Sequence, residues 1–248
     1  MANSSDKKNK KENGILLKLW RWGKKIFLWI FVIQLLYIIV LKWINPPFTI
    51  TQLVSWVSGD GLKRDYVDGS SIAANAKLAV IAAEDQLFPN HGGFDWQSIK
   101  RAMRHNEKKP GRVRGASTIS QQVAKNVFLW QGRSWIRKGL EVYYTFMIEL
   151  IWGKKRILEM YLNVIEMGEG VYGIEMAANK YFNKSADRLN RQEAAMIAAC
   201  LPNPKKYKVK PVSSYVLFRS RVIIRQMNNL QSDPDIRNII GADEPGKK

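Results

Sequence analysis

The residues best suited to chemistry lie between Gly115 and Asn126, where a glycine turn precedes hydroxyl, amide and ammonium side chains. Thr118 can cap a helix that starts after it, and Gln121, three residues on, completes the capping-box pattern. Gln121 and Lys125 are four residues apart and share a face of that helix. The helix start offers backbone N–H groups and the positive end of the dipole, which suit a phosphate or diphosphate. An ordinary capped surface helix has the same pattern, so this segment alone leaves both interpretations open.

Glu84 is a candidate general base. It lies near the C-terminal end of an Ala-rich segment, Ile72 to Phe88, that we expect to be helical. The negative end of the helix dipole disfavours a further negative charge there, and burial beside Phe88 would act in the same direction. Both effects raise the pKa of a carboxyl group, which makes it a better proton acceptor near neutral pH. A solvated glutamate at a helix end is the alternative.

Glu141 is a second carboxylate with different neighbours. Arg137 precedes it by four residues and Lys138 by three, so on a helix both cations can reach it and keep it ionised. Two carboxylates in unlike environments are typical of split roles in carbohydrate chemistry. The alternative is a surface ion pair, which would contribute less than about 1 kcal/mol to stability.

Several further segments accompany these residues in a fixed order. Together they resemble the motifs of glycosyltransferase family 51, the peptidoglycan glycosyltransferases, over the range from Pro46 to Tyr207; the matching segments are Glu84–Gly93, Gly115–Asn126, Arg137–Glu141, Lys155–Asn163, Gly168–Lys184 and Glu193–Pro204. One departure is Gln86, where the family usually has arginine. The chain has no room for a penicillin-binding domain, so the resemblance is to the monofunctional members.

The resemblance implies a mostly α, lysozyme-like domain that polymerises lipid II into β-1,4-linked glycan. Glu84 would deprotonate the 4-hydroxyl of an incoming lipid II, and that oxygen would attack C1 of the growing chain with inversion. Undecaprenyl diphosphate would leave, bound by Lys125 and Arg133, since a guanidinium binds phosphate oxygens bidentately. Glu141 would support the leaving-group side through a weakly held Mg²⁺ or Mn²⁺, because hard cations prefer carboxylate and phosphate oxygens.

The family motifs extend the expected substrate-binding set beyond these residues. The remaining candidates are polar side chains of the same segments, namely Asp85, Ser117, Thr118, Gln121, Gln122, Asn126, Lys138, Lys155 and Arg156. The run from His105 to Arg114 is expected to be a flexible basic loop at the cleft mouth, or else a plain solvated loop. His91 and His105 are the only histidines, and neither has a ligand partner at helical spacing, so a tight zinc site is not expected.

Helices must position these groups. Ser70 or Ser71 can cap the helix that ends at about Phe88, and Ser134 can cap one that ends near Gly153. Another is expected from about Lys155 to Met167, one from Asn190 with its Glu193 to Pro202, and a last one from Ser213 to about Leu230. The sequence shows no alternating strand pattern of useful length, so the fold class is mostly α.

The chain is expected to divide into a basic cytoplasmic segment (1–25), a transmembrane signal anchor (26–44), a connector (45–69), the glycosyltransferase domain (70–231) and a flexible tail (232–248). Ile26 to Leu41 is apolar except for Gln34, and Trp43 and Ile44 extend the run to about 17–20 residues, near the lower limit for a membrane span. Lysines and arginines precede this run and only Lys42 follows it, which predicts a cytoplasmic N-terminus and a periplasmic catalytic domain at the bacterial inner membrane. A cleaved signal peptide would need a small-x-small site, and none precedes Pro46; a buried core helix is the other alternative.

The net charge of +19 predicts an anionic partner. Lipid II, the growing lipid-linked strand and the membrane surface all qualify, and cell-wall synthesis or division proteins are possible further partners. A lysozyme-type lytic enzyme is the nearest rival, although it has no use for a diphosphate clamp. A non-enzymatic binder of nucleic acid or anionic lipid would explain the charge, but it explains neither Glu84 nor Glu141, and no nucleic-acid motif is present. The one cysteine, Cys200, excludes an intrachain disulfide.

Overall fold

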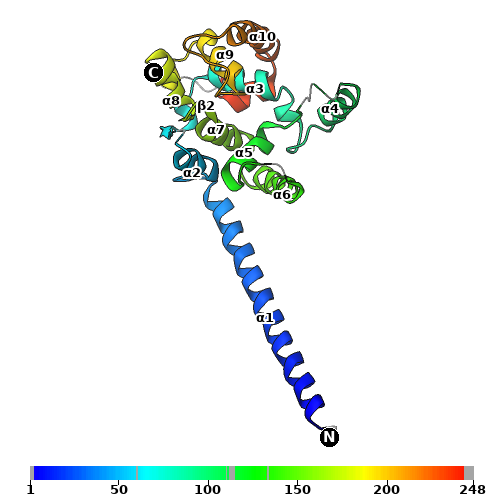
Figure 1. The fold of residues 1–248 in the computed structure, drawn as a ribbon. Helices are drawn as coiled ribbons and strands as arrows, with labels where there is room; N and C mark the ends of the chain where they lie inside the picture. The colour runs from blue at the N-terminus through cyan, green and yellow to red at the C-terminus, as the bar shows by residue number, and fades with distance from the viewer. Residues whose placement is uncertain (1–2, 60, 110, 112–114, 133, 243–248) are drawn as a thin grey trace. The chain divides into compact units, whose positions relative to one another are not determined.

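A computed structural model describes residues 3–59, 61–109, 111, 115–132 and 134–242, with side chains from residue 17 onward. The chain divides into two compact units, Met1–Ile44 and Asn45–Lys248. The expected mostly α fold is confirmed, because helices account for most of the described residues (Figure 1).

The first unit is a single long helix, α1 (Asn3–Val40). Its stretch Leu17–Val40 has 24 residues and contains an 18-residue window with a mean hydropathy of 1.9, which makes it long and apolar enough to cross a membrane. Large apolar side chains are exposed along this stretch, including Phe27 at 71% and Trp29 at 66%. A helix of this kind near the N-terminus is consistent with a single-pass membrane anchor.

The second unit is built from short helices and one small sheet. The helices are α2 (Ile50–Val57), α3 (Ala74–Glu84), α4 (Trp96–Lys108), α5 (Ile119–Phe128), α6 (Trp135–Ile151), α7 (Lys154–Val164), α8 (Ile174–Phe182), α9 (Arg191–Cys200), α10 (Ser214–Leu230) and α11 (Pro234–Ile240). Three single-turn 3₁₀ helices, η1 (Gly69–Ser71), η2 (Phe88–Asn90) and η3 (Ala186–Arg188), lie in the connections. The sheet has the order β1 (Lys63–Arg64), β3 (Val171–Tyr172), β2 (Glu166–Gly168), with β1 parallel and β2 antiparallel to β3.

The core of this unit is formed by the Ala-rich helices α3 and α9 together with α5 and α7. Ala79 and Ala82 of α3 and Ala195 and Ala199 of α9 are completely buried. Small side chains let these two helices approach closely, and α10 packs against both of them. Helix α5, in turn, packs against α6 and α7. The two most important segments of the sequence, around Glu84 and after Thr118, therefore lie on rigid core helices.

Helix caps predicted from the sequence are confirmed at Thr118, Ser134 and Asn190, and Ser213 provides a cap that was not predicted. The Thr118 and Gln121 pair forms a full capping box at the start of α5, and the Asn190 and Glu193 pair does so for α9. Ser134 and Ser213 cap α6 and α10 by accepting a backbone N–H in the first turn. Each cap supplies a partner for an N–H that would otherwise lack one.

The start of α3 was predicted wrongly. The helix begins at Ala74, while Ser70 and Ser71 belong to η1, and no side chain caps α3. Ile72 is extended and only 3% exposed, and the N–H of Ala73 donates to the carbonyl of Ala186 at 3.1 Å. Burial of Ile72 in an extended conformation therefore outweighs the local capping signal. At the other end Glu84 is the last helical residue, rather than Phe88.

Two segments expected to be flexible contain helix. The tail expected from residue 232 includes α11, which is capped by Asp233 and buries Ile236 and Ile240, so the boundary after 231 was wrong for that helix. The basic run expected from His105 overlaps the last turn of α4, where His105 and Lys108 are helical. Residues 110 and 112–114 of that run lie outside the described residues.

Candidate functional site

A cleft of about 1000 Å³ opens at the C-terminal end of α3. Its walls come from the end of α3, the segment before α5, and helices α4 and α10. The lining residues that bear on its chemistry are Glu84, Asp85, Gln86, Asp95, Ser98, Arg101, Ser117, Thr118, Gln122, Arg219 and Gln226. The structure therefore brings together four of the predicted substrate-binding residues, Asp85, Ser117, Thr118 and Gln122, around Glu84.

Glu84, the last residue of α3, lines this cleft and is half-buried. The amide of Gln122 donates a hydrogen bond of 2.7 Å from Nε2 to Glu84 Oε2. Burial raises the pKa of Glu84 above its usual value, and the Gln122 hydrogen bond and the Arg219 charge oppose that rise, while Asp85 adds to it. A carboxylate with a raised pKa that still faces a cleft can accept a proton near neutral pH.

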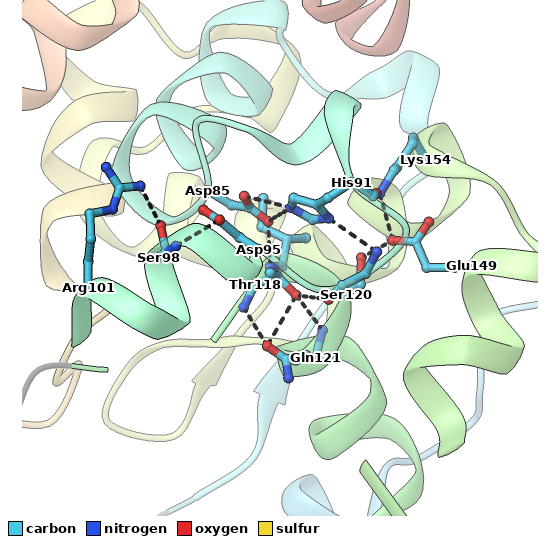
Figure 2. A network of polar contacts seen from close by, with 12 residues as sticks. Asp85, His91, Asp95, Ser98, Arg101, Thr118, Ser120, Gln121, Glu149 and Lys154 are labelled. Atoms are coloured by element: carbon cyan, nitrogen blue, oxygen red, sulfur yellow. Dashed lines mark hydrogen bonds and ion pairs between the residues drawn. The ribbon is translucent and has the colours of Figure 1, made fainter. Parts of the chain in front are cut away.

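Asp85, the next residue, has a different environment. Its carboxylate is buried, accepts the N–H of Ile119 at 3.0 Å and lies 3.0 and 3.1 Å from Nε2 of His91 (Figure 2). The N–H of Gly93 donates to Nδ1 of the same ring at 3.1 Å, so Nε2 carries the ring proton that Asp85 accepts. Asp85 thus joins the end of α3, the following loop and the start of α5.

This arrangement corrects one expectation about α5. The helix start was expected to offer free N–H groups to a phosphate, but the N–H of Ile119 is bonded to Asp85 and that of Gln121 to Thr118 Oγ1. The anion at this helix N-terminus is a side chain of the protein itself. Phosphate groups must therefore be recognised mainly by side chains in this region.

Further hydrogen bonds fix the loop between Asp85 and Gly93 (Figure 2). Thr118 donates from Oγ1 to the carbonyl of Gly93 at 2.7 Å. Lys154 donates at 2.6 Å both to the carbonyl of His91 and to Glu149, which also accepts a bond from Ser120. Gly93 has φ +91°, and a Cβ there would lie 2.7 Å from the Thr145 side chain, so only glycine fits. The loop is rigid, which keeps the end of α3 in place.

Glu141 forms a second charged cluster on α6. Its carboxylate receives Arg137 Nη1 at 2.9 Å and Lys138 Nζ at 2.5 Å. The Glu141 side chain is only 4% exposed and that of Arg137 12%, so this is a buried ion pair and not the surface pair considered as the alternative. Removing one charge from such a cluster leaves the others without compensation.

Lys125 lies beside this cluster on α5. Burial lowers the pKa of its ammonium group; the charge of Glu141 opposes that effect, and those of Arg137 and Lys138 add to it. Within the described part of the chain, its side chain has no hydrogen bond or ion pair. A half-buried ammonium group without a direct partner favours the binding of an anion.

Helix α5 links the cleft to the cluster. Gln122, which contacts Glu84, and Lys125, which faces the Glu141 cluster, are three residues apart and so lie on one side of the helix about 4.5 Å apart along its axis. The candidate base and the candidate diphosphate cation are therefore held by adjacent turns of one helix.

The other predicted residues have mixed placements. Gln121 is buried, and its amide oxygen accepts the N–H of Thr118. Asn126 is buried and donates to the carbonyl of Gln122. Lys155 is exposed on α7, and Arg156 pairs with Glu159 at 2.5 Å. Arg133 lies outside the described residues. None of these side chains lines the cleft around Glu84 as far as the structure describes it.

Sequence reasoning missed several residues of the site. Arg219 and Gln226 of α10 and Ser98 and Arg101 of α4 line the cleft. Their position depends on how distant helices pack, which no local pattern indicates. Tyr161 was also missed, although it lies in the matching segment Lys155–Asn163; its hydroxyl donates to Gln122 Oε1 at 3.2 Å.

The site does not fit a metal ion held by the protein alone. Residues 17–242, so far as they are described, contain no group of three or more His, Cys, Asp or Glu side chains that could ligate a metal. Both oxygens of Glu141 already face cations. A divalent cation at this position would meet positive charge unless an anionic substrate accompanied it.

Comparisons with known proteins give a consistent result. The family model described as transglycosylase matches residues 51–228. The chain is similar to the biosynthetic peptidoglycan transglycosylase of Yersinia pseudotuberculosis serotype O:3 (strain YPIII), at 49% identity over 222 residues, covering 87% of this chain and 92% of the relative. It is also similar to the protein of the same description from Yersinia pestis (strain Pestoides F), at 48% identity over 220 residues, covering 86% and 91%.

Proposed function

Since this chain belongs to the transglycosylase family and is a peptidoglycan glycosyltransferase, we propose that it polymerises lipid II into β-1,4-linked glycan with Glu84 as the general base. The observation that carries the proposal is that α5 contacts the Glu84 carboxyl group through Gln122 and also carries the Lys125 ammonium group. Glu84 faces a cleft with a raised pKa, and Lys125 presents a half-buried ammonium group one turn along the helix from the glutamine that contacts Glu84.

In the proposed reaction the 4-hydroxyl of an incoming lipid II gives its proton to Glu84. The oxygen attacks C1 of the growing chain, and the bond from C1 to the diphosphate oxygen breaks as the new glycosidic bond forms. One displacement inverts the configuration at C1. Undecaprenyl diphosphate leaves with a growing negative charge, and Lys125 stabilises it electrostatically together with Arg133. Such donors act strongly where water is excluded.

Glu141 supports this step by holding its two cations in place. Its contacts to Arg137 and Lys138 fix positive charge beside Lys125, where the diphosphate would lie. We propose that Lys138, whose side chain is 44% exposed, also contacts the diphosphate, and that Asp85, Ser117, Thr118 and Gln122 bind substrate in the cleft around Glu84. A divalent cation is proposed only as a counter-ion that arrives with the diphosphate.

The N-terminal helix supports a membrane location for this reaction. We propose that residues 26–44 are a single-pass anchor of the bacterial inner membrane, with the N-terminus cytoplasmic and the catalytic unit periplasmic; the apolar helix Leu17–Val40 supports this span. The lysines and arginines before the span, against Lys42 alone after it, favour this orientation. A lipid-linked substrate confined to the outer leaflet would then be within reach of the catalytic unit.

The test is polymerisation of labelled lipid II by the detergent-solubilised protein with a divalent cation. Wild type should produce long glycan strands and Glu84→Gln none, because the amide cannot accept the proton. Glu169→Gln, which changes an exposed carboxylate between β2 and β3, should polymerise as wild type does. Strands from Glu84→Gln would remove Glu84 from its role. Release of label from purified sacculi without strand growth would favour the lytic alternative.

A further inference from the structure

We propose that Tyr161 is a positioning residue for polymerisation: its hydroxyl fixes the Gln122 amide so that the NH₂ group faces Glu84. This inference rests on the proposed role of Glu84 as the base. It adds Tyr161 of α7, which is not among the described residues that line the cleft but contacts the lining residue Gln122, to the groups that prepare the base.

The contacts form a chain of three side chains from three helices. Tyr161 of α7 donates from its hydroxyl to Gln122 Oε1 at 3.2 Å. Gln122 of α5 then donates from Nε2 to Glu84 Oε2 at 2.7 Å. An amide side chain has one accepting end and one donating end. With its oxygen held by a hydroxyl group, the amide turns its donors towards the carboxylate.

Tyr161 is suited to act as a permanent donor. Its side chain is completely buried. Burial raises the pKa of Tyr161 well above its usual value, and the charges of Glu84 and Asp85 and the nearby Cys200 act in the same direction. The phenol therefore stays protonated throughout the working pH range. Among the described residues its hydroxyl has Gln122 as its one hydrogen-bond partner.

The amide is the group through which α7 can influence the base. Burial disfavours the ionised form of Glu84, and the Gln122 hydrogen bond opposes that effect. Without the phenol hydroxyl, Gln122 Oε1 loses its hydrogen bond from Tyr161, so the amide gains freedom to rotate. The hydrogen bond from Gln122 to Glu84 would also weaken, because hydrogen bonds in a chain strengthen one another. The carboxylate would then be held less firmly and its ionised form less stabilised.

Other groups facing Glu84 would stay in place when the phenol oxygen is removed. Asp85 is the neighbouring residue, Arg219 and Tyr215 come from α10, and Cys200 comes from α9. Their charges and dipoles are present in both forms of the protein. A change in the behaviour of Glu84 would therefore be due to the Gln122 contact.

The experiment compares Tyr161→Phe with wild type in full-length protein, with kcat and KM for labelled lipid II measured across pH. We expect kcat to fall about tenfold with KM unchanged, as for the loss of one buried hydrogen bond that orients a reacting group. The acidic limb of the kcat/KM profile should move to higher pH, because a less stabilised carboxylate protonates earlier. Incorporation of 3-fluorotyrosine at position 161, a stronger donor of the same shape, should move that limb to lower pH.

Tyr181→Phe is the matched control. Tyr181 is also buried, at 8% exposure, and its hydroxyl donates to the carbonyl of Met167 at 3.1 Å, away from Gln122. Both variants should lower the melting temperature by a similar amount, while only Tyr161→Phe should move the pH limb. In a Gln122→Ala background, Tyr161→Phe should have no further effect on kcat.

Two results would overturn the inference: a wild-type kcat and pH limb in Tyr161→Phe, or an equal shift of the limb in Tyr181→Phe. If 3-fluorotyrosine moved the limb to higher pH, the direction of the argument would be wrong. Failure of the underlying function is separable. If Glu84→Gln keeps its activity, Glu84 is not the base. If Glu84→Gln is inactive but Tyr161→Phe behaves as wild type does, only the positioning role of Tyr161 is rejected.

Discussion

At the scale of single residues, the proposed chemistry depends on opposed influences on the pKa of one carboxyl group, that of Glu84. Burial raises the pKa of Glu84, and Gln122 and Arg219 hold that rise in check. A base needs a pKa close to the working pH, since one that is too low accepts protons poorly and one that is too high is already protonated. In the proposed reaction, the neighbours of Glu84 therefore determine the pH range in which the enzyme works.

Arg219→Gln tests this balance. Loss of the guanidinium charge should raise the pKa of Glu84 further. Activity requires the ionised carboxylate, so the acidic limb of the kcat/KM profile should move to higher pH, with the alkaline limb unchanged. The measurement is the pH profile of lipid II polymerisation. Arg221→Gln, an exposed arginine two residues on, is the control and should leave the limb where it is. Identical profiles for both variants would show that Arg219 does not act on the base.

The Glu141 cluster gives a prediction about stability as well as activity. Glu141→Gln leaves the buried Arg137 without its counter-charge, which should cost about 2–4 kcal/mol of unfolding free energy. Lys138 is 44% exposed, so Lys138→Met should cost less than about 1 kcal/mol. Denaturant unfolding of both variants in detergent measures these values. Equal losses in the two variants would contradict the view that the buried charge of Glu141 contributes more to stability than the partly exposed charge of Lys138.

At the scale of elements, α5 is the part that aligns the site. Its first turn is fixed to the loop after α3, its second turn contacts Glu84 through Gln122, and Lys125 follows on the same side. A change in the position of this helix would move the base contact and the diphosphate cation together. The cap of α5 should therefore matter more for catalysis than a cap elsewhere.

Thr118→Ala tests that expectation. The variant loses the cap to Gln121 and the hydrogen bond to the carbonyl of Gly93, which together should cost about 2 kcal/mol. We expect kcat to fall about tenfold or more because the alignment of Gln122 is disturbed. Asn190→Ala removes the corresponding cap of α9 and should lose about 1 kcal/mol with kcat within about twofold of wild type. Equal effects on kcat would contradict the special role of α5.

The elements also show what the sequence could reveal. The caps at Thr118, Ser134 and Asn190 were predictable because the capping side chain and the N–H that it accepts lie only three positions apart. The start of α3 was not, because the burial of Ile72 and the bond from Ala73 to Ala186 involve distant parts of the chain. For the same reason α11 was missed, since the burial of Ile236 and Ile240 depends on packing against the distant helices α3 and α7.

In the candidate site, too, features set by local spacing could be predicted from the sequence, and contacts between distant segments could not. Glu84, Glu141 and Lys125 lie within recognisable motifs, and the pairing of Glu141 with Arg137 and Lys138 was predictable from helical spacing. The contact between Glu84 and Gln122 joins residues 38 positions apart, and Arg219 comes from a helix that packs on α3 only in the folded chain. Asp85 was predicted as a substrate-binding residue, and its internal bonds to Ile119 and His91 could not be anticipated from spacing.

At the scale of the whole molecule, the chain combines an apolar helix with a separate catalytic unit. The unit Asn45–Lys248 has its own buried core, so removal of residues 1–44 should leave it folded. Attachment to the same surface as a lipid-linked substrate raises the effective concentration of the two partners. The anchor should therefore matter most when the substrate lies in a bilayer.

The truncated form tests this division of labour. With lipid II in vesicles, the rate of the truncated protein should be at least about tenfold below that of full-length protein. In detergent micelles the difference should shrink to about twofold or less, because the substrate is no longer confined to a surface that the anchor shares. The measurement is the initial rate of strand formation in each medium. A loss of equal size in both media would mean that the first 44 residues support the catalytic unit itself.

The internal bond between Asp85 and the start of α5 has a consequence for translocation. A helix N-terminus is a fixed binding place, whereas lysine and arginine side chains end in long flexible stems that can follow a moving ligand. Because Asp85 occupies the N–H of Ile119, the diphosphate of the proposed reaction would be held by such side chains. A polymerase must shift its product by a sugar unit after each addition, and a charge held on flexible stems resists that sliding less than a rigid backbone pocket would. The same feature bears on inhibitor design: a compound whose phosphate mimic is aimed at this helix start would compete with a carboxylate that is already in place.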